Sequence, residues 1–313
     1  MSENVAAEPC VALGGTGRAP EAYPGRDLRL GDLQVTRVLP VRGRRLVGPW
    51  CFLDRFGPLA FASGKPMDVG PHPHIGLQTV TWLLDGEVLH DDSLGFESVA
   101  RAGGVNVMTA GAGIAHAEQT PARHSNLLSG VQLWVALPDA VRNGPPGFQH
   151  VAEVPVAELR GGIVRPFAGS LGGATSPASY HSPIAGAQID VWPEATVDMD
   201  ADRSFEHAAL LLEGDASADN TQLAPHVLYY FGRGRGELAF RSRAGAKILL
   251  VGGLPFGETI LMWWNFVART PGEIAAARAD WEQGHRFGPV RGYAGPPIPA
   301  PPLARLASPN TIS

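Results

Sequence analysis

Residues 70–92 read GPHPHIGLQTVTWLLDGEVLHDD, and this stretch decides the fold of the first half of the chain. Two strand-like runs flank the dipeptide Asp85-Gly86. A two-residue Asp-Gly loop is a strong hairpin signal, because the tight turn needs positive φ. The stretch therefore predicts an antiparallel β-hairpin, and His72 and His74 lie on the segment that leads into it.

Alternation along this stretch predicts which side chains share a face. Side chains at positions i and i+2 of a strand point the same way. His72, His74 and Gln78 have the same parity as Trp82. We therefore expect all four side chains to point towards one interior, provided that no bulge intervenes at Gly76.

A second short motif answers the first, since residues 110–118 read AGAGIAHAE. Two histidines one residue apart deliver two imidazoles from one strand, and a histidine and a glutamate with the same spacing add a nitrogen and a carboxylate from another. Such a donor set suits a first-row divalent metal. Each histidine taken alone reads as an ordinary core or surface residue. The two paired motifs, each beside a glycine-rich bend, favour a metal site formed by His72, His74, His116 and Glu118.

The composition indicates a well-buried globular protein. Of the 313 residues, 44% are hydrophobic and 18% charged, with 39 glycines and 28 prolines, which suits short strands joined by tight turns. The formal charge of −5, without a basic cluster, gives no case for direct binding of nucleic acid or of an anionic membrane. No apolar run reaches about 18 residues. Two cysteines and no signal-like start lead us to expect a cytoplasmic protein.

The chain divides into four parts by composition and pattern. Residues 1–25 mix glycine, alanine, proline and charge without a period, and predict a flexible lead-in. Residues 26–143 form a first β domain that contains the metal site. A Pro- and Gly-rich segment follows, and residues 148–290 carry a second series of short strand candidates, typical of another sandwich or barrel. Residues 291–313 predict an extended tail.

One helix is expected near residues 271–284. Thr270 is a good N-cap, Pro271 suits the first turn, and Glu273 completes a capping box. Gly284 is typical of the residue at which a helix ends. The sequence thus predicts an all-β protein with a short C-terminal helix.

The motifs together resemble the pirin family of the cupin superfamily, over roughly residues 30–302 of this chain. The segments that carry the resemblance are VGPW (47–50), FLDRFGP (52–58), GPHPHIG (70–76), TVTW (79–82), DSLG (92–95), MTAGAGIAHAE (108–118), WNFVARTP (264–271) and ARADW (277–281). The resemblance implies two stacked cupin-type β-barrels, a bicupin, with metal in the N-terminal barrel only. It places the four ligands on His72, His74, His116 and Glu118.

The resemblance also implies what the centre does. Iron, as Fe(II), is the metal that it favours, with Cu, Ni, Mn and Zn as alternatives. Some relatives act as quercetin 2,3-dioxygenases on a flavonol-like aromatic and dioxygen, and Glu118 would then be the catalytic base that takes the substrate's hydroxyl proton. Other relatives are non-enzymatic regulators that bind a transcription factor or a metabolic enzyme, and this alternative stays open.

Several residues near the motifs have less certain roles. Gln78 stands where many family members have glutamate, and its parity predicts a neutral hydrogen-bond partner at the site. His90, Asp91 and Asp92 could form an acid–base cluster, but we expect a structural or supporting role. In the second domain, His207 is isolated and belongs to no paired set.

Overall fold

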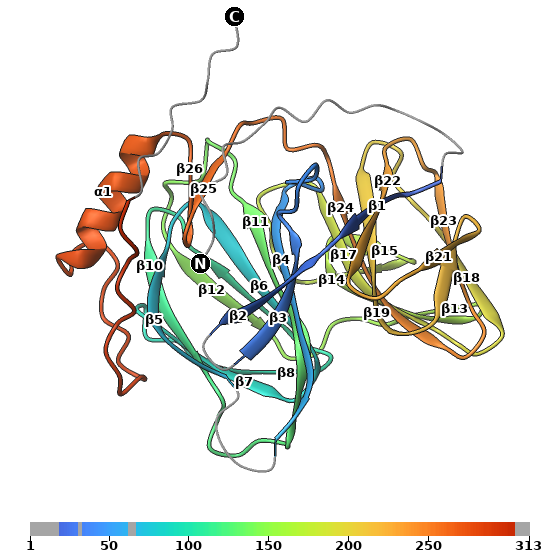
Figure 1. Ribbon diagram of the computed structural model, residues 1–313, viewed down its shortest axis with the longest axis horizontal. Helices are drawn as coiled ribbons and strands as arrows, with labels where there is room; N and C mark the ends of the chain where they lie inside the picture. The colour runs from blue at the N-terminus through green and yellow to red at the C-terminus, as the bar shows by residue number, and fades with distance from the viewer. Residues whose placement is uncertain (1–18, 31–32, 62–66, 304–313) are drawn as a thin grey trace, which may run out of the picture.

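The computed structural model describes residues 19–30, 33–61 and 67–303. Strands make up 55% of the structure and helix 4%, and the strands form two barrels that lie side by side (Figure 1). The prediction of an all-β, two-barrel fold is confirmed. No helix in the described ranges is long and apolar enough to cross a membrane.

The first barrel consists of a seven-stranded and a four-stranded sheet. The larger sheet has the order β12-β9-β6-β11-β4-β3-β2, and the smaller has the order β5-β10-β7-β8, all antiparallel. The strands are β2 (Arg26–Leu30), β3 (Leu33–Leu39), β4 (Trp50–Ala60), β5 (Asp68–His74), β6 (Leu77–Asp85), β7 (Glu87–Asp92), β8 (Glu97–Arg101), β9 (Val105–Thr109), β10 (Ile114–Gln119), β11 (Leu127–Ala136) and β12 (Gly147–Val151).

The second barrel repeats this plan. Its larger sheet has the order β1-β22-β19-β24-β17-β14-β13, and its smaller sheet has the order β18-β23-β20-β21. The strands are β1 (Glu21–Pro24), β13 (Ala157–Leu159), β14 (Gly162–Ala168), β17 (Ile184–Val191), β18 (Ala195–Asp200), β19 (Glu206–Gly214), β20 (Ala216–Ala218), β21 (Thr221–Leu223), β22 (Val227–Gly232), β23 (Glu237–Ser242) and β24 (Ala246–Gly253). β15 (Ser170–Leu171) and β16 (Ala174–Thr175) pair to form a short two-stranded ribbon.

The predicted tight turn is present, with β6 and β7 joined at Gly86, but the predicted antiparallel hairpin is wrong because these two strands do not pair with each other. Gly86 has φ +86°, and a Cβ there would lie 2.2 Å from the carbonyl oxygen of Leu127. The turn therefore needs glycine for both its backbone conformation and its space. β6 and β7 belong to different sheets, so this turn links the two layers of the first barrel.

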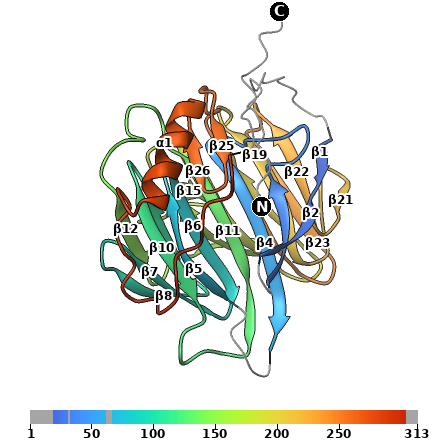
Figure 2. The same ribbon diagram turned by 60° about the vertical axis from the view of Figure 1, so that its left-hand side comes forward.

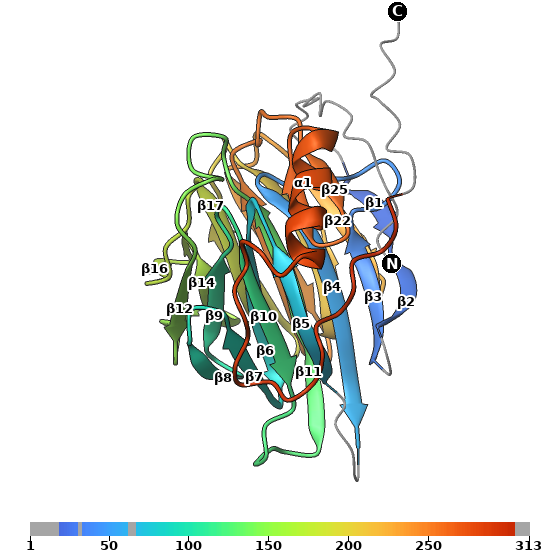
Figure 3. The same cartoon turned by 90° about the vertical axis from the view of Figure 1, so that its left-hand side faces the viewer.

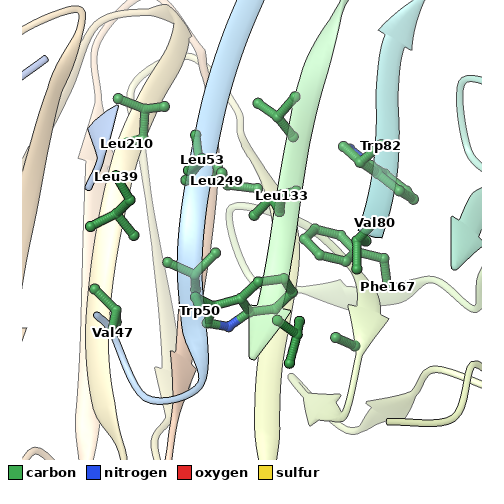
Figure 4. Close-up of a cluster of buried hydrophobic side chains, with 14 of the residues drawn as sticks. Leu39, Val47, Trp50, Leu53, Val80, Trp82, Leu133, Phe167, Leu210 and Leu249 are labelled. Atoms are coloured by element: carbon green, nitrogen blue, oxygen red, sulfur yellow. The ribbon is translucent and has the colours of Figure 1, made fainter. Parts of the chain in front are cut away.

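The two large sheets pack face to face and share one apolar core (Figure 4). Trp50 of β4, buried completely, donates from Nε1 to the carbonyl oxygens of Ala185 (3.1 Å) and Gly252 (3.0 Å) in the second barrel. Trp82 of β6 stacks on Phe167 of β14 with ring centroids 5.1 Å apart. These contacts bury both faces of the first large sheet, because its other face lines the interior of its own barrel.

The prediction of a flexible segment over residues 1–25 is wrong for Glu21–Pro24, which form β1. Residues 1–18 lie outside the described part of the chain, but β1 pairs with β22 of the second barrel. β2 then joins the first barrel by pairing with β3. The N-terminal segment thus bridges the two barrels, which its mixed composition does not reveal.

The predicted boundary near residues 143–148 also shifts, because β12 pairs with β9 and extends the first barrel to Val151. The ribbon of β25 (Leu261–Trp263) and β26 (Phe266–Ala268) and helix α1 (Pro271–Glu282) follow the second barrel in sequence. They nevertheless pack on the first barrel, beside β5 and β10 (Figures 1 and 3). Apolar contacts of Phe266 and Ile274 with Ala115 and Ala117 place them there.

Helix α1 begins as predicted, since Thr270 caps it and accepts a hydrogen bond from the backbone N–H of Glu273 at 3.2 Å. The chain after α1 runs back over the outer face of the first barrel (Figure 2). There the N–H of Ile298 donates to the carbonyl oxygen of Pro71 at 2.8 Å. Residues 304–313 of the predicted tail lie outside the described ranges.

We predict that Trp50→Ala lowers the free energy of unfolding by about 3–5 kcal/mol, because it leaves a cavity and removes two hydrogen bonds at the interface of the barrels. Urea denaturation measures the change. Trp192→Ala is the matched control, since that side chain is 49% exposed, and we expect a change within about 0.5 kcal/mol. Equal losses in the two variants would contradict the shared core.

Candidate metal centre

Three of the four predicted ligands lie together inside the first barrel. β5 and β10 are antiparallel neighbours, and His116 stands directly opposite His72 while Ile114 stands opposite His74. His72 and His74 share a face because they are two positions apart on β5. The two strands therefore present three imidazoles to the same side of the small sheet.

The three histidines form the cluster with metal-ligand geometry in the described part of the chain. One ring nitrogen of each lies within 4.8 Å of the others, and the Nε2 atoms of His74 and His116 are 3.1 Å apart. The ring centroids are 4.3–5.1 Å apart. Each residue is at most 7% exposed. Rings packed this closely and buried this deeply cannot all carry charge.

Hydrogen bonds at Nδ1 orient two of the rings. Nδ1 of His72 lies 2.9 Å from the carbonyl oxygen of Gly70, and Nδ1 of His74 lies 3.0 Å from that of Asn265. A carbonyl oxygen only accepts, so Nδ1 of each ring carries the proton. Nε2 is then a bare lone pair, which is the form in which a neutral histidine binds metal.

Burial keeps the cluster neutral. Desolvation lowers the pKa of His72 to about 4, and it lowers the pKa of His74 and of His116 well below their ordinary value, with repulsion among the rings as a further cause. Neutral imidazoles do not need to release a proton before they bind a cation. Three neutral nitrogens with aligned lone pairs fit a first-row divalent metal.

Glu118, the fourth predicted ligand, lies outside this three-histidine group. It follows His116 on β10 by two positions, but the pairing with β5 shifts register between these residues. His116 therefore stands opposite His72, whereas Glu118 stands opposite Val69. The carboxylate is buried, and the side chain of Thr81 lies beside it. Burial raises its pKa. Its role as a ligand and as a base stays a prediction.

His90 lies closer to the centre than the sequence indicated. It stands opposite Glu118 on the neighbouring strand β7, and its Nδ1 is 3.3 Å from Nδ1 of His116. Its Nε2 is 3.2 Å from Oδ2 of Asp92. Their spacing of two along a strand is the signal that could have placed His90 and Asp92 on one face. Asp91, between them, points away and accepts a hydrogen bond from Gln119.

The predicted common face of His74 and Trp82 is wrong. Gly76 lies between β5 and β6 with φ +67°, and these strands belong to different sheets. The alternation of side chains along β5 does not predict the alternation along β6, because the chain changes sheet at this turn. Trp82 faces the second barrel, where its Nε1 donates to Oε1 of Gln188 at 3.0 Å, whereas Thr81 faces Glu118.

The expectation that Gln78 contacts the site is wrong for the same reason. Gln78 shares the face of Trp82, and its Nε2 donates to Oγ1 of Thr109 (3.0 Å) and to the carbonyl oxygen of Ser179 (3.3 Å). The side chain is fully buried between the barrels. Gln78 therefore belongs to the interface between the barrels and not to the histidine cluster.

An aromatic wall beside the cluster was missed by the sequence analysis. Trp134 of β11 meets the ring of His74 edge to face, with centroids 5.3 Å apart, and stacks on Phe52 at 4.0 Å. The guanidinium of Arg37 lies 4.4 Å from the Phe52 ring and pairs through two hydrogen bonds with buried Asp54. The sequence signal that could have indicated this pair is the presence of Arg37 and Asp54, of opposite charge, within two apolar strand-like runs.

Comparison with known proteins identifies relatives along most of the chain. The family model described as pirin matches residues 32–135, and the model of the pirin C-terminal cupin domain matches residues 186–288. A Pseudomonas aeruginosa protein named "Putative quercetin 2,3-dioxygenase" is 44% identical over 276 residues, which cover 87% of each chain. A pirin-like protein of Caulobacter vibrioides is 38% identical, covering 84% of this chain and 92% of its own.

A solved structure shows the same architecture. The crystal structure of quercetin 2,3-dioxygenase from Acinetobacter baumannii superposes with a TM-score of 0.88 at 38% sequence identity. The match covers 92% of this chain and 96% of that one. The similarity therefore includes both barrels.

We predict that the metal-free protein loses stability as the pH falls from about 6.5 towards 4. In the unfolded chain the three histidines titrate near 6.5, whereas the folded ones stay neutral, so the unfolded state binds more protons in this range. Each histidine contributes a slope of at most about 1.4 kcal/mol per pH unit. Urea denaturation at several pH values measures the slope.

The matched variant for this test is His74→Gln, which removes one titrating ring. Its free energy of unfolding should depend less steeply on pH than that of the parent, by up to one proton's contribution. Glu118, whose pKa is raised, acts in the opposite direction in both proteins and cancels from the comparison. Identical slopes would show that His74 is not held neutral in the folded state.

Proposed function

This chain belongs to the pirin family, and from that membership we propose that it is a metal-dependent dioxygenase acting on a flavonol-like aromatic, as a quercetin 2,3-dioxygenase does. The observation that carries the proposal is the cluster of buried, neutral imidazoles with their Nε2 atoms turned together. The names of the relatives and of the superposed crystal structure support the reaction class.

We propose His72, His74, His116 and Glu118 as the metal ligands. A divalent metal held there would supply positive charge for a deprotonated flavonol oxygen and a place for dioxygen. Fe(II) is the metal that we propose. Copper or zinc would bind such a nitrogen-rich set more tightly, so the metal available in the cell decides which one is loaded.

The protein's own side chains then have distinct roles. Glu118 takes the proton of the substrate hydroxyl, and its burial favours this role because the raised pKa makes it a stronger base than an exposed carboxylate. Trp134 and Phe52 place apolar ring faces beside His74, which suits a planar aromatic substrate. Arg37 is neutralised by Asp54, so the wall offers no free cation to the substrate.

The direct test is oxygen consumption by Fe(II)-loaded protein supplied with quercetin, measured with an oxygen electrode. We expect uptake that depends on both metal and flavonol. His74→Ala should reduce uptake to the metal-free background, because it removes one of the clustered nitrogens. His124→Ala, which changes an exposed histidine of the same barrel, is the matched control and should keep the parent rate.

Two outcomes would overturn the proposed reaction. The first is metal binding without any uptake of oxygen with quercetin, which would favour the regulatory role of other family members. The second is uptake that His74→Ala leaves unchanged, which would mean that the histidine cluster is not the site of the chemistry.

A further inference from the structure

Asp92 is fixed as a hydrogen-bond acceptor at the end of β7. Its side chain is fully buried, and Oδ1 accepts the backbone N–H groups of Leu94 (2.9 Å) and Phe96 (3.1 Å). Its other oxygen, Oδ2, lies 3.2 Å from Nε2 of His90. Oδ2 therefore lies where it can accept a hydrogen from Nε2 of His90.

His90 passes this constraint to a proposed metal ligand. Its ring is stacked on Phe148 with centroids 4.4 Å apart and planes 11° apart, so its orientation is fixed. When the hydrogen of His90 lies on Nε2 alone, its Nδ1 is a lone pair that faces Nδ1 of His116 at 3.3 Å. A cation bound to Nε2 of His116, which lies 3.1 Å from Nε2 of His74, requires the hydrogen of this ring on Nδ1, where His90 accepts it.

This arrangement separates His116 from the other two histidines of the cluster. Backbone carbonyl oxygens hold His72 and His74 in the Nδ1–H form, and a carbonyl cannot become a donor. The tautomer of His116 depends instead on a second imidazole, which can donate or accept at either nitrogen. The carboxylate of Asp92, on the far side of the His90 ring, determines whether His90 donates to His116 or accepts from it.

We propose that Asp92 and His90 are positioning residues of the metal centre, with Asp92 setting the tautomer of His90 and His90 setting that of His116. Their effect is to present Nε2 of His116 as a lone pair and so to strengthen binding of a divalent cation. The inference rests on the proposed metal centre but not on the proposed reaction. Partners that orient metal-bound histidines typically contribute 10–100-fold in affinity.

Asp92→Asn tests the proposal with an almost isosteric change. The carbonyl of the new amide can keep both backbone hydrogen bonds, so the turn at Leu94 and Phe96 is preserved. Its NH₂ group then faces Nε2 of His90 as a donor and reverses the hydrogen-bond direction along the whole chain. We expect the dissociation constant for Zn²⁺, measured by competition with a chromophoric chelator, to rise about 10–100-fold.

Measuring Asp92→Asn again in a protein that carries His90→Asn shows whether Asp92 acts through His90. In His90→Asn the side-chain carbonyl takes the place of Nδ1 and accepts from His116 without help from Asp92. We expect this variant to bind Zn²⁺ within about threefold of the parent, and adding Asp92→Asn to it should change the affinity little. His90→Gln, which loses the acceptor opposite His116, should bind as weakly as Asp92→Asn alone.

The outcomes that would overturn the proposal are distinct. They are full Zn²⁺ affinity in Asp92→Asn, or an equal loss from this change in both backgrounds, which would indicate a structural role. His207→Asn changes a buried histidine of the second barrel and should leave the affinity unaltered. A parent protein that binds no Zn²⁺ would contradict the metal centre itself.

Nitrogen-15 NMR of histidine-labelled protein loaded with Zn²⁺ reads the tautomer of His90 directly. We expect its hydrogen on Nε2 in the parent, because Nδ1 then accepts from His116 and Nε2 donates to Asp92. A hydrogen on Nδ1 of His90, or on both of its nitrogens, would overturn the proposal.

Discussion

The packing of three neutral imidazoles in a buried space is the constraint on which the metal centre depends. Each ring needs a partner at Nδ1, because an unpaired buried nitrogen is costly and an unfixed ring has no defined tautomer. Gly70, Asn265 and His90 supply these partners. Two of them are backbone carbonyls, so the fold itself determines the form of most of the cluster.

This constraint explains why distant parts of the chain gather around β5. Asn265, 191 positions from His74, reaches it because the ribbon of β25 and β26 packs on the first barrel. The N–H of Val267 donates to the carbonyl oxygen of Ile75, and Gly76 leaves room for that close approach. The C-terminal ribbon and α1 thus belong functionally to the metal-binding barrel. The second barrel acts from the other side, where it covers the large sheet through Trp50 and Trp82.

Local signals in the sequence predicted most of the strands, turns and the helix of the fold. Positive φ at Gly86 and the cap at Thr270 are local requirements, and both the turn and the helix are found where they were expected, whereas the strands on either side of the turn pair with other strands. Parity failed beyond Gly76, because alternation describes one strand and the chain changes sheet at that turn. It failed for Gln78 for a further reason: β6 is buried on both faces, so burial alone does not tell the metal side from the interface.

The sequence by itself determined the strand pairs that carry the histidines, since i and i+2 spacing fixes their common face, and it determined the two-barrel architecture through its motifs. Only the tertiary structure decided which groups surround the cluster. The contacts of His74 with Asn265 and of His116 with His90 join segments with no shared local pattern. Hydrogen-bond direction depends on atoms that meet across strands, and such encounters are a property of the folded chain.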